Sequence, residues 1–301
     1  MELYFIHSIK WEGLSNMAQI QWYPGHMAKA EREIESKIKL IDIVIELVDA
    51  RAPYSSKNRT FDRIIKNKPR LIVMTKKDLA DNQVTELWID AFKKQGYEAM
   101  TVNLKSFNEY KKIINKCKLV LREKMEKERS RGLKPRAIRA MVIGVPNVGK
   151  STFINQLAKR KAAVTGNRPG VTKAQQIIRV DKDFELFDTP GVLAPKYTNE
   201  QIAKNVALIG SIKLDILPRD DLFIYAISYL NKYYPSALKE RYDLSFDEQE
   251  DWVLPVFEQI AKVRHLKKVR GETDYERVMD LFFKDLFDGA FGSVSWERPN
   301  V

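Results

Sequence analysis

The sequence predicts an α/β fold, a doubly wound and mostly parallel six-stranded sheet, followed by a small all-α region. Short apolar runs alternate with amphipathic stretches between residues 24 and 188, which is typical of parallel strands joined by helices. Residues 140–151, AMVIGVPNVGKS, combine a strand, a glycine-hinged loop and the first turn of a helix. From residue 198 the pattern is helical, so we expect a second domain there.

The first half of the chain contains three predicted strands. A helix is expected after Pro24, where apolar residues recur at steps of three and four: Met27, Ala30, Ile34, Ile38 and Ile41. The next predicted elements are a strand at 43–48, a helix at 58–67, a strand from residue 71, a helix at 86–95 and a strand at 98–103. A lysine-rich helix then leads to a linker at 131–135.

The second half supplies the other three strands and the helical region. Strands are expected at 140–145, 175–180 and 184–188, with a helix at 152–159 after the first of them. Further helices are expected at 201–209, 221–233, 248–263 and 275–287. One face of the second of these helices is apolar, and we interpret it as core rather than as a stacking platform for bases: Leu222, Tyr225, Ala226, Tyr229 and Leu230.

Composition indicates a soluble globular protein with room for two domains, since 44% of the 301 residues are hydrophobic and 31% are charged. The single cysteine, Cys117, is expected to be a half-buried helix residue, and it fits a reducing compartment. No apolar run is long enough to cross a membrane and no address signal is visible, so we expect a cytoplasmic protein. Residues 1–16 are expected to be a dispensable extension or an upstream-start artefact.

The net charge of +12 is unevenly distributed. Residues 198–301 hold 14 basic and 18 acidic residues, a net charge of −4, so the first 197 residues carry +16. Within them, residues 105–139 hold 13 basic residues against 4 acidic ones. Such a segment suits contact with a phosphate backbone, although a solvated basic helix is the alternative.

The glycine-hinged loop has the spacing of a phosphate-binding loop, Gly-x-x-x-x-Gly-Lys-Ser, from Gly144 to Ser151. Backbone N–H groups of such a loop hold a triphosphate at the start of a helix. Lys150 is expected to reach the β- and γ-phosphates, and the Ser151 hydroxyl to bind Mg²⁺.

Two further segments have the character of a nucleotide switch. Residues 184–191, FELFDTPG, form a strand that ends in Asp-x-x-Gly, so Asp188 is expected to hold Mg²⁺ and the Gly191 N–H to meet the γ-phosphate. The loop at 167–172, NRPGVT, carries Thr172, which is expected to complete the Mg²⁺ shell.

A guanine-reading loop is absent downstream but present upstream. Residues 71–79, LIVMTKKDL, form an apolar strand that runs into Thr75, Lys76, Lys77 and Asp78. The Asp78 carboxylate can accept two hydrogen bonds from guanine, a pattern that adenine does not offer. Alone, this short motif is more typical of a solvated loop, and only its pairing with the downstream loops makes it the missing part of a permuted domain.

The order of the motifs, together with WYPGHMAKA (22–30), VDAR (48–51) and GVPNVGKS (144–151), resembles the circularly permuted GTPases that assemble ribosomes, specifically the ribosome biogenesis GTPase A family. The resemblance implies an N-terminal extension at 1–17, a permuted GTPase domain at 18–197 and a helical RNA- or ribosome-binding domain at 198–301. It also implies these GTP-binding residues: Thr75, Lys76, Lys77, Asp78, Asn103, Leu104, Asn147, Val148, Gly149, Lys150, Ser151, Thr152 and Gly191. Thr75 is a departure, because the family often has Asn there.

Catalysis requires a separate hypothesis, because Val192 occupies the position where many GTPases carry a water-orienting Gln. The internal candidate is His26, whose imidazole could position water near the γ-phosphate; a packing role is the alternative. Lys150 is the second catalytic candidate. Asn147 resembles the residue that holds K⁺ in potassium-activated GTPases, so K⁺ is expected as an activator beside Mg²⁺.

The resulting hypothesis is a GTPase that binds a precursor of the large ribosomal subunit, promotes its late assembly and leaves on GTP hydrolysis. We expect a monomer without membrane contact. The RNA-binding candidates are the dense basic cluster near the chain's end: Lys262, Arg264, Lys267, Lys268 and Arg270. A GTP-gated RNA-binding module and a signalling GTPase without a ribosomal role remain the alternatives.

Overall fold

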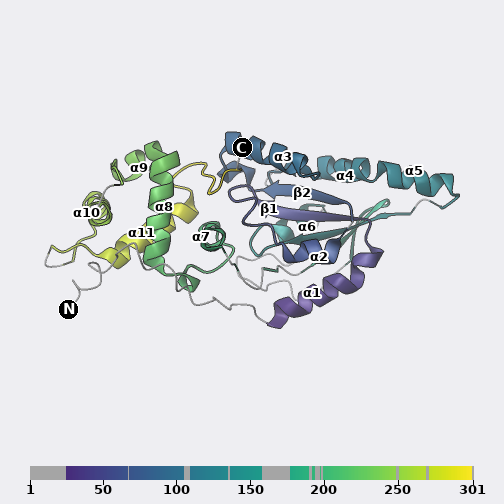
Figure 1. Cartoon of the computed structure of the whole chain (residues 1–301), viewed down its shortest axis with the longest axis horizontal. Helices are drawn as coiled ribbons and strands as arrows, with labels where there is room; N and C mark the ends of the chain where they lie inside the picture. Colours follow the sequence, from purple (N-terminus) through teal and green to yellow (C-terminus); the bar gives the residue numbers. More distant parts are fainter. Residues whose placement is uncertain are drawn as a thin grey trace.

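The computed structural model consists of a sheet domain and a helical domain (Figure 1). It describes residues 25–66, 68–104, 109–134, 136–157, 177–189, 192–193, 197, 199–248, 251–268 and 271–299, with the backbone alone at 25–27, 30 and 110. The expected extension at 1–17 lies outside this range. None of the described helices is both long and apolar enough to cross a lipid bilayer.

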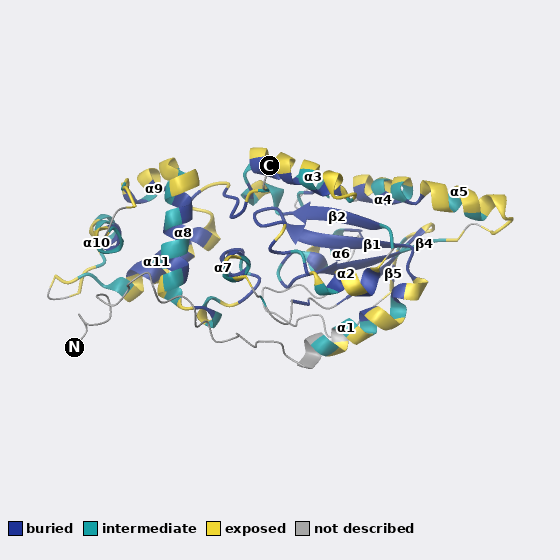
Figure 2. Ribbon diagram, viewed as in Figure 1, coloured by how far each residue is buried: buried dark blue, intermediate teal, exposed yellow. Residues whose placement is uncertain are grey.

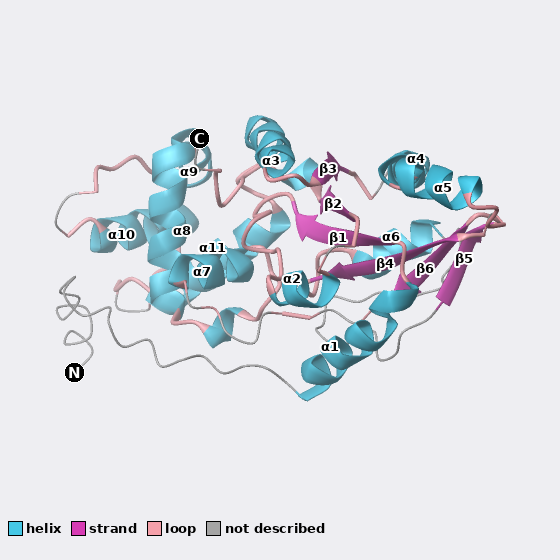
Figure 3. Ribbon diagram, turned by 45° about the vertical axis from the view of Figure 1, so that its right-hand side comes forward, coloured by secondary structure: helices cyan, strands magenta, loops and turns pink. Residues whose placement is uncertain are grey.

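The sheet has six strands in the order β3-β2-β1-β4-β6-β5 (Figure 3). The strands are β1 (Ile43–Asp49), β2 (Arg70–Thr75), β3 (Glu98–Thr101), β4 (Ile138–Gly144), β5 (Ile177–Asp181) and β6 (Phe184–Asp188). All pairs are parallel except β5 with β6. Every residue of β1 and β2 is buried, as expected for strands covered on both faces (Figure 2). The predicted sheet is therefore confirmed.

The helices of the sheet domain depart from prediction at two places. They are α1 (Gly25–Lys37), η1 (Ile38–Leu40), α2 (Thr60–Ile65), η2 (Lys77–Leu79), α3 (Asn82–Lys94), α4 (Glu109–Val120), α5 (Arg122–Ser130) and α6 (Lys150–Leu157). α3 begins four residues earlier than expected, because the Asp81 carboxylate accepts hydrogen bonds from the N–H groups of Gln83 and Val84. The lysine-rich helix is divided in two at the buried Leu121.

The prediction that Cys117 is half-buried is wrong. Its side chain is fully buried on the inner face of α4, in the same core as Ile113 and Leu121. Burial raises the pKa of its thiol to about 12, because the thiolate would lose its hydration. Cys117 is therefore a packing residue.

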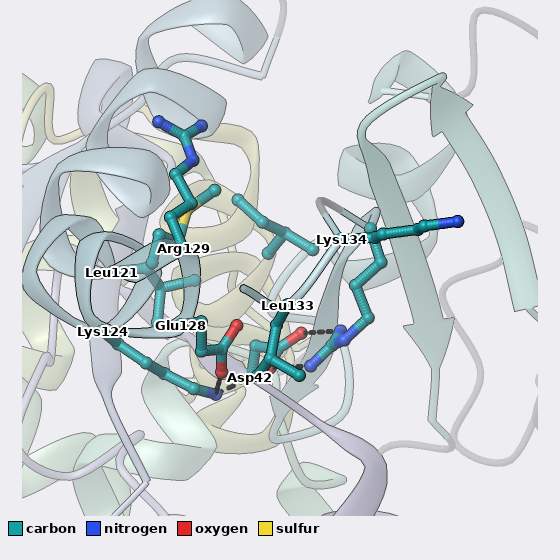
Figure 4. A pocket seen from close by; sticks show the side chains of 10 residues that line it. Asp42, Leu121, Lys124, Glu128, Arg129, Leu133 and Lys134 are labelled. Atoms are coloured by element: carbon teal, nitrogen blue, oxygen red, sulfur yellow. Dashed lines mark hydrogen bonds and ion pairs between the residues drawn. The ribbon is translucent and has the colours of Figure 1, made fainter. Parts of the chain in front are cut away.

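Asp42 connects the start of β1 to the segment between α5 and β4 (Figure 4). Its carboxylate accepts hydrogen bonds from Arg136 at 2.6 and 2.7 Å, from Lys124 at 2.8 Å and from the Arg139 N–H at 3.0 Å. Burial alone would raise the pKa of Asp42, but these donors hold it well below its ordinary value. The predicted linker is thus anchored to the sheet.

The described part of the helical domain contains one α-helix more than predicted, and also a short 3-10 helix. Its elements are α7 (Glu200–Leu208), η3 (Leu214–Ile216), α8 (Arg219–Tyr233), α9 (Pro235–Tyr242), α10 (Val253–Arg264) and α11 (Tyr275–Asp288). The unpredicted helix, α9, begins with Pro235, which is compatible with a first helical position. α10 begins at Val253 rather than residue 248. The predicted α8 core face is confirmed, although Tyr225 is only half-buried.

The chain returns to the sheet domain after α11. The Val294 N–H donates to the Leu79 carbonyl at 3.1 Å, and the Trp296 N–H donates to the Arg51 carbonyl at 2.6 Å. Trp296 is itself buried against Tyr229 of α8, with ring centroids 5.5 Å apart. The C-terminal segment, residues 294–299, therefore packs against both domains.

Candidate functional site

The carboxyl ends of four neighbouring strands bring the predicted motifs to one edge of the sheet. Asp49 of β1 lies opposite Thr75 of β2, Leu47 of β1 lies opposite Gly144 of β4, and Val142 of β4 lies opposite Asp188 of β6. The three predicted motifs are far apart in the sequence. Parallel pairing nevertheless places them side by side, where doubly wound sheets bind ligands.

The predicted phosphate loop connects β4 to α6 in a conformation that depends on its glycines. A Cβ atom on Gly144 would lie 2.6 Å from the Leu47 carbonyl oxygen, closer than a real Cβ comes. Gly149 has φ +97° and packs on Leu104, whose Cδ1 would lie 2.9 Å from an added Cβ. Asn147 has φ +59°, in the left-handed region that asparagine tolerates. The motif's spacing thus has a local steric cause.

Lys150 and Asp188 face each other at the buried end of the loop. The Lys150 ammonium donates to the Gly144 carbonyl at 3.2 Å and to the Val145 carbonyl at 3.3 Å. Burial lowers the pKa of Lys150 to about 8, and the nearby Asp188 charge opposes this effect. Burial likewise raises the pKa of Asp188 to about 6, against the field of Lys150. A phosphate group beside Lys150 would favour its charged form.

The donor set near Asp188 fits Mg²⁺. Asp188 Oδ1 is buried and has no hydrogen-bond partner within the part of the chain that the structure describes. Ser151 lies in the first turn of α6, beside Lys150. The described residues contain no cluster of three or more His, Cys, Asp or Glu side chains suited to a metal. Mg²⁺ would therefore depend on nucleotide phosphates for part of its shell. The predicted Thr172 and Gly191 lie outside the described residues.

The predicted guanine loop contacts the phosphate loop directly. The Thr75 hydroxyl donates to the Val148 carbonyl at 2.7 Å and also lies 3.1 Å from the Val48 carbonyl. Lys77 and Asp78 follow Thr75 and lie in η2. Asn103 and Leu104 come directly after β3, the strand beside β2. The structure thus brings the predicted base-reading and phosphate-holding residues together.

Asp49 organises the guanine loop, a role that sequence reasoning missed. The carboxylate of Asp49 accepts two hydrogen bonds from the Arg51 guanidinium, at 2.9 and 2.8 Å, and pairs with Lys76 at 2.9 Å. Burial alone would raise the pKa of Asp49, but the two cations hold it well below its ordinary value. The sequence signal for this role is VDAR (48–51), which the sequence alone tied only to the family resemblance.

Two side chains of the site reach the helical domain, and neither contact was predicted. Arg51 donates to the Ile209 carbonyl at 2.9 Å, and the Asn147 side-chain amide donates to the Gly210 carbonyl at 2.8 Å. These carbonyls belong to successive residues just after α7. The loop after β1 and the phosphate loop therefore both contact one turn of the helical domain.

Val192, which replaces the usual Gln, is a core residue. Its side chain is fully buried, and its carbonyl accepts a hydrogen bond from the Asn58 amide at 3.0 Å. Its N–H lies 3.4 Å from the Gly144 carbonyl. Val192 thus fixes the end of the Asp-x-x-Gly segment against the phosphate loop, and it has no group that could orient water.

The remaining predicted site residues lie elsewhere. The basic cluster begins in the last turn of α10 and continues after it, at the side of the helical domain away from the sheet (Figure 1). Lys262, Lys267 and Lys268 are exposed, while Arg264 is half-buried and donates to the Arg241 carbonyl at 3.3 Å. Arg270 lies outside the described residues. The backbone of His26 lies in the first turn of α1, but its side chain is not among the described ones.

A protein-family model described as 50S ribosome-binding GTPase matches residues 139–250. The chain is 46% identical to Ribosome biogenesis GTPase A of Bacillus cereus over 280 residues, which cover 93% of this chain and 94% of the relative. It is 33% identical to the protein of that name from Thermotoga maritima, over 93% and 95% of the two chains. It is also 31% identical to Mitochondrial ribosome-associated GTPase 1 of Mus musculus, over 93% and 91%.

Solved structures of similar fold are known in two nucleotide states. The GDP-bound TM YlqF structure matches with a TM-score of 0.63 and 29% identity, over 89% of this chain and 99% of that one. The GNP-bound YlqF of T. maritima matches with a TM-score of 0.62 and 28% identity, over 90% and 99%. The similarity covers both domains.

We predict that Thr75→Val weakens binding of GTP and GDP alike, by about tenfold, because two buried carbonyls lose their shared donor. Thr75→Ser retains the hydroxyl and should bind nucleotide nearly as the parent does. Titration with fluorescent GTP and GDP analogues measures both. Equal affinities of the Val and Ser variants would show that this hydrogen bond does not support the site.

Proposed function

The chain belongs to the ribosome biogenesis GTPase A family and is a GTP hydrolase with a circularly permuted GTPase domain, and from this premise we propose that it binds a precursor of the large ribosomal subunit. It would promote late assembly of that particle and leave it when GTP is hydrolysed. The observation that supports this timing most directly is the pair of contacts to Ile209 and Gly210, one from Asn147 in the phosphate loop and one from Arg51, which holds Asp49 beside the guanine loop. A change of nucleotide state would alter these contacts and would reach the helical domain through this turn.

In the proposed complex, GTP lies across the carboxyl ends of the parallel strands. Asp78 reads the guanine edge, with Thr75, Lys76, Lys77, Asn103 and Leu104 forming the base pocket. The phosphates lie on the loop from Asn147 to Thr152, with Lys150 against the β- and γ-phosphates and Gly191 at the γ-phosphate. Ser151, Thr172 and Asp188 would hold Mg²⁺, which would neutralise charge on the same phosphates.

The partner surface is basic and lies on both domains. In the sheet domain, α5 and the linker after it expose Arg122, Lys127, Arg129, Arg131 and Lys134. Lys124 and Arg136 are instead engaged with Asp42 (Figure 4). In the helical domain the proposed RNA contacts are Lys262, Arg264, Lys267, Lys268 and Arg270. Arg264 is half-buried and bonded to the Arg241 carbonyl, so we assign the larger share of the contacts to the lysines, whose exposed ammonium groups can reach phosphates. The proposed setting is a cytoplasmic monomer without membrane contact.

Co-sedimentation with ribosomal particles tests this function. We predict retention on large-subunit precursors with GTP or a non-hydrolysable analogue, and release with GDP. Charge reversal of Lys267 and Lys268 should weaken retention about tenfold or more at physiological salt, because each phosphate contact releases counterions. Charge reversal of Lys239 in α9 is the control, because it alters one charge outside the basic cluster.

The sedimentation experiment also separates the alternatives. Retention that ignores the nucleotide would favour a passive RNA-binding module, and the absence of retention in every nucleotide state would favour a signalling GTPase. Retention by small-subunit particles alone would contradict the proposed partner.

We propose His26 as the group that positions the attacking water, since Val192 is buried and apolar. His26→Ala should reduce particle-stimulated turnover about 100-fold, in the range of general-base contributions, while GTP affinity stays unchanged. Single-turnover hydrolysis with and without particles measures the first quantity, and nucleotide titration the second. Parallel loss of both would assign His26 a structural role instead.

We propose further that Asn147 holds K⁺ beside the phosphates, where added positive charge would favour hydrolysis. Turnover in KCl should exceed turnover in NaCl about 100-fold at equal ionic strength, which is the effect of losing one electrostatic donor in other active sites. Asn147→Ala should abolish the difference. Equal rates of the parent protein in both salts would overturn this proposal.

A further inference from the structure

An open cleft of about 650 Å³ lies between the two domains. Its walls come from the loop after β1 and from α3 on one side, and from α7 and α8 on the other, while the C-terminal segment lines it as well. None of the residues predicted to bind nucleotide lines it. The volume is that of a small-ligand site.

Aromatic rings form both walls of this cleft. On the sheet-domain side, Tyr54 is 41% exposed and stacks on Trp88, with ring centroids 6.3 Å apart and an interplanar angle of 22°. On the other side Tyr233 is 36% exposed, and its ring centroid lies 4.7 Å from that of Tyr229. A cation already lies over each exposed ring, with the Arg59 guanidinium carbon 4.4 Å from the Tyr54 centroid, so a flat partner would stack on the ring surface that is still exposed.

The Tyr229 hydroxyl is an independent sign of a ligand. Tyr229 is only 9% exposed, and its oxygen has no hydrogen-bond partner in the described part of the chain. Buried hydroxyls are normally paired, because an unpaired one forfeits its bond to water. The nearby Tyr225 hydroxyl shows the normal case, since it donates to Asn205 Oδ1 at 2.7 Å.

The lining is polar and nearly uncharged. Amide side chains of Gln95, Asn199 and Gln201 line the cleft and can pair with the edge of a base. Its charged lining groups are Glu297 and Arg298. Glu297 is already engaged, since it accepts hydrogen bonds from the Ser55 N–H and hydroxyl and from the Asn205 amide. Arg298 lies over the Tyr233 ring, 4.7 Å from its centroid.

We propose that this cleft binds the base of an unpaired RNA nucleotide. Stacking between aromatic rings and pairing with amides is how proteins hold bases that have left a helix. One arginine at the cleft suits a single phosphodiester, whereas a free triphosphate would need more positive charge. The inference rests on the proposed role at ribosomal RNA and extends it to a defined contact away from the GTP site.

The test uses the full chain and a fluorescently labelled, mixed-sequence single-stranded RNA of eight nucleotides. We expect Tyr54→Ala and Tyr233→Ala each to weaken binding about tenfold, the usual effect of losing one stacking ring. Tyr229→Phe, which removes only the unpaired hydroxyl, should weaken it about fivefold. The matched control is Tyr275→Phe in α11, a hydroxyl outside the cleft, and it should bind as the parent does.

Repeating the titrations at two salt concentrations separates stacking from the basic surfaces. All affinities fall with salt, but the ratio of variant to parent should persist, because stacking releases no counterions. Each variant should also keep its GTP turnover and melting temperature. If a variant loses stability, the other ring variant supplies the comparison.

Three outcomes would overturn the proposal. Parent-like RNA binding by both ring variants would exclude a stacked base. Binding of AMP or GMP that quenches Trp88, without binding of the RNA, would assign the cleft to a free nucleotide. A duplex RNA bound better than the single strand would exclude an unpaired base. If the parent fails to sediment with ribosomal particles yet binds the oligonucleotide through these rings, the proposed function fails and the cleft site remains.

Discussion

The hydrogen bond from the Thr75 hydroxyl to the Val148 carbonyl is the contact on which the proposed site depends. It joins two loops 73 residues apart in the sequence, and it is possible because β1 alone separates their strands in the sheet. Strand order in space, rather than in the chain, decides which loops meet. A permuted chain can therefore keep the same site, provided its new connection does not disturb the sheet. Asp42 secures that connection through Arg136 and Lys124.

The permutation changes what the site is attached to. The chain leaves the Asp-x-x-Gly segment and enters α7 within about ten residues. Arg51 and Asn147 then bind the carbonyls of Ile209 and Gly210, which follow that helix. The loop after β1, the phosphate loop and the connection into α7 thus converge on the same turn. Apolar packing also holds the turn, since Ile209 and Ile212 are buried, so a change of nucleotide would have to rearrange the two polar contacts while the core stays packed.

Sequence reasoning placed the phosphate loop, TKKD and the strand that ends at Asp188 at the edge of the sheet where the structure has them, because each is a run of adjacent residues. For the phosphate loop, the sterics of Gly144 and Gly149 supply the local cause of the spacing. Sequence reasoning failed where partners are distant in the chain. Nothing near Asn147 in the sequence indicates that its side chain contacts Gly210. Cys117 was misjudged for a related reason, since the composition around it is polar while its own helix face is buried. The sequence likewise did not reveal α9, an eight-residue helix with a weak apolar pattern.

The C-terminal segment shows how far such distant contacts extend. Glu297 is buried among donors from Ser55 and Asn205, one residue from each domain, and burial raises the pKa of its carboxyl to about 7. A carboxylate in that position links the loop after β1 to α7, beside the turn that the nucleotide loops contact. The same hydrogen bonds of Glu297 hold the two aromatic walls at a distance that leaves a cleft. If α7 moves with the nucleotide, as the proposed function requires, the width of the cleft would change with it, and Glu297 would couple the two proposed sites.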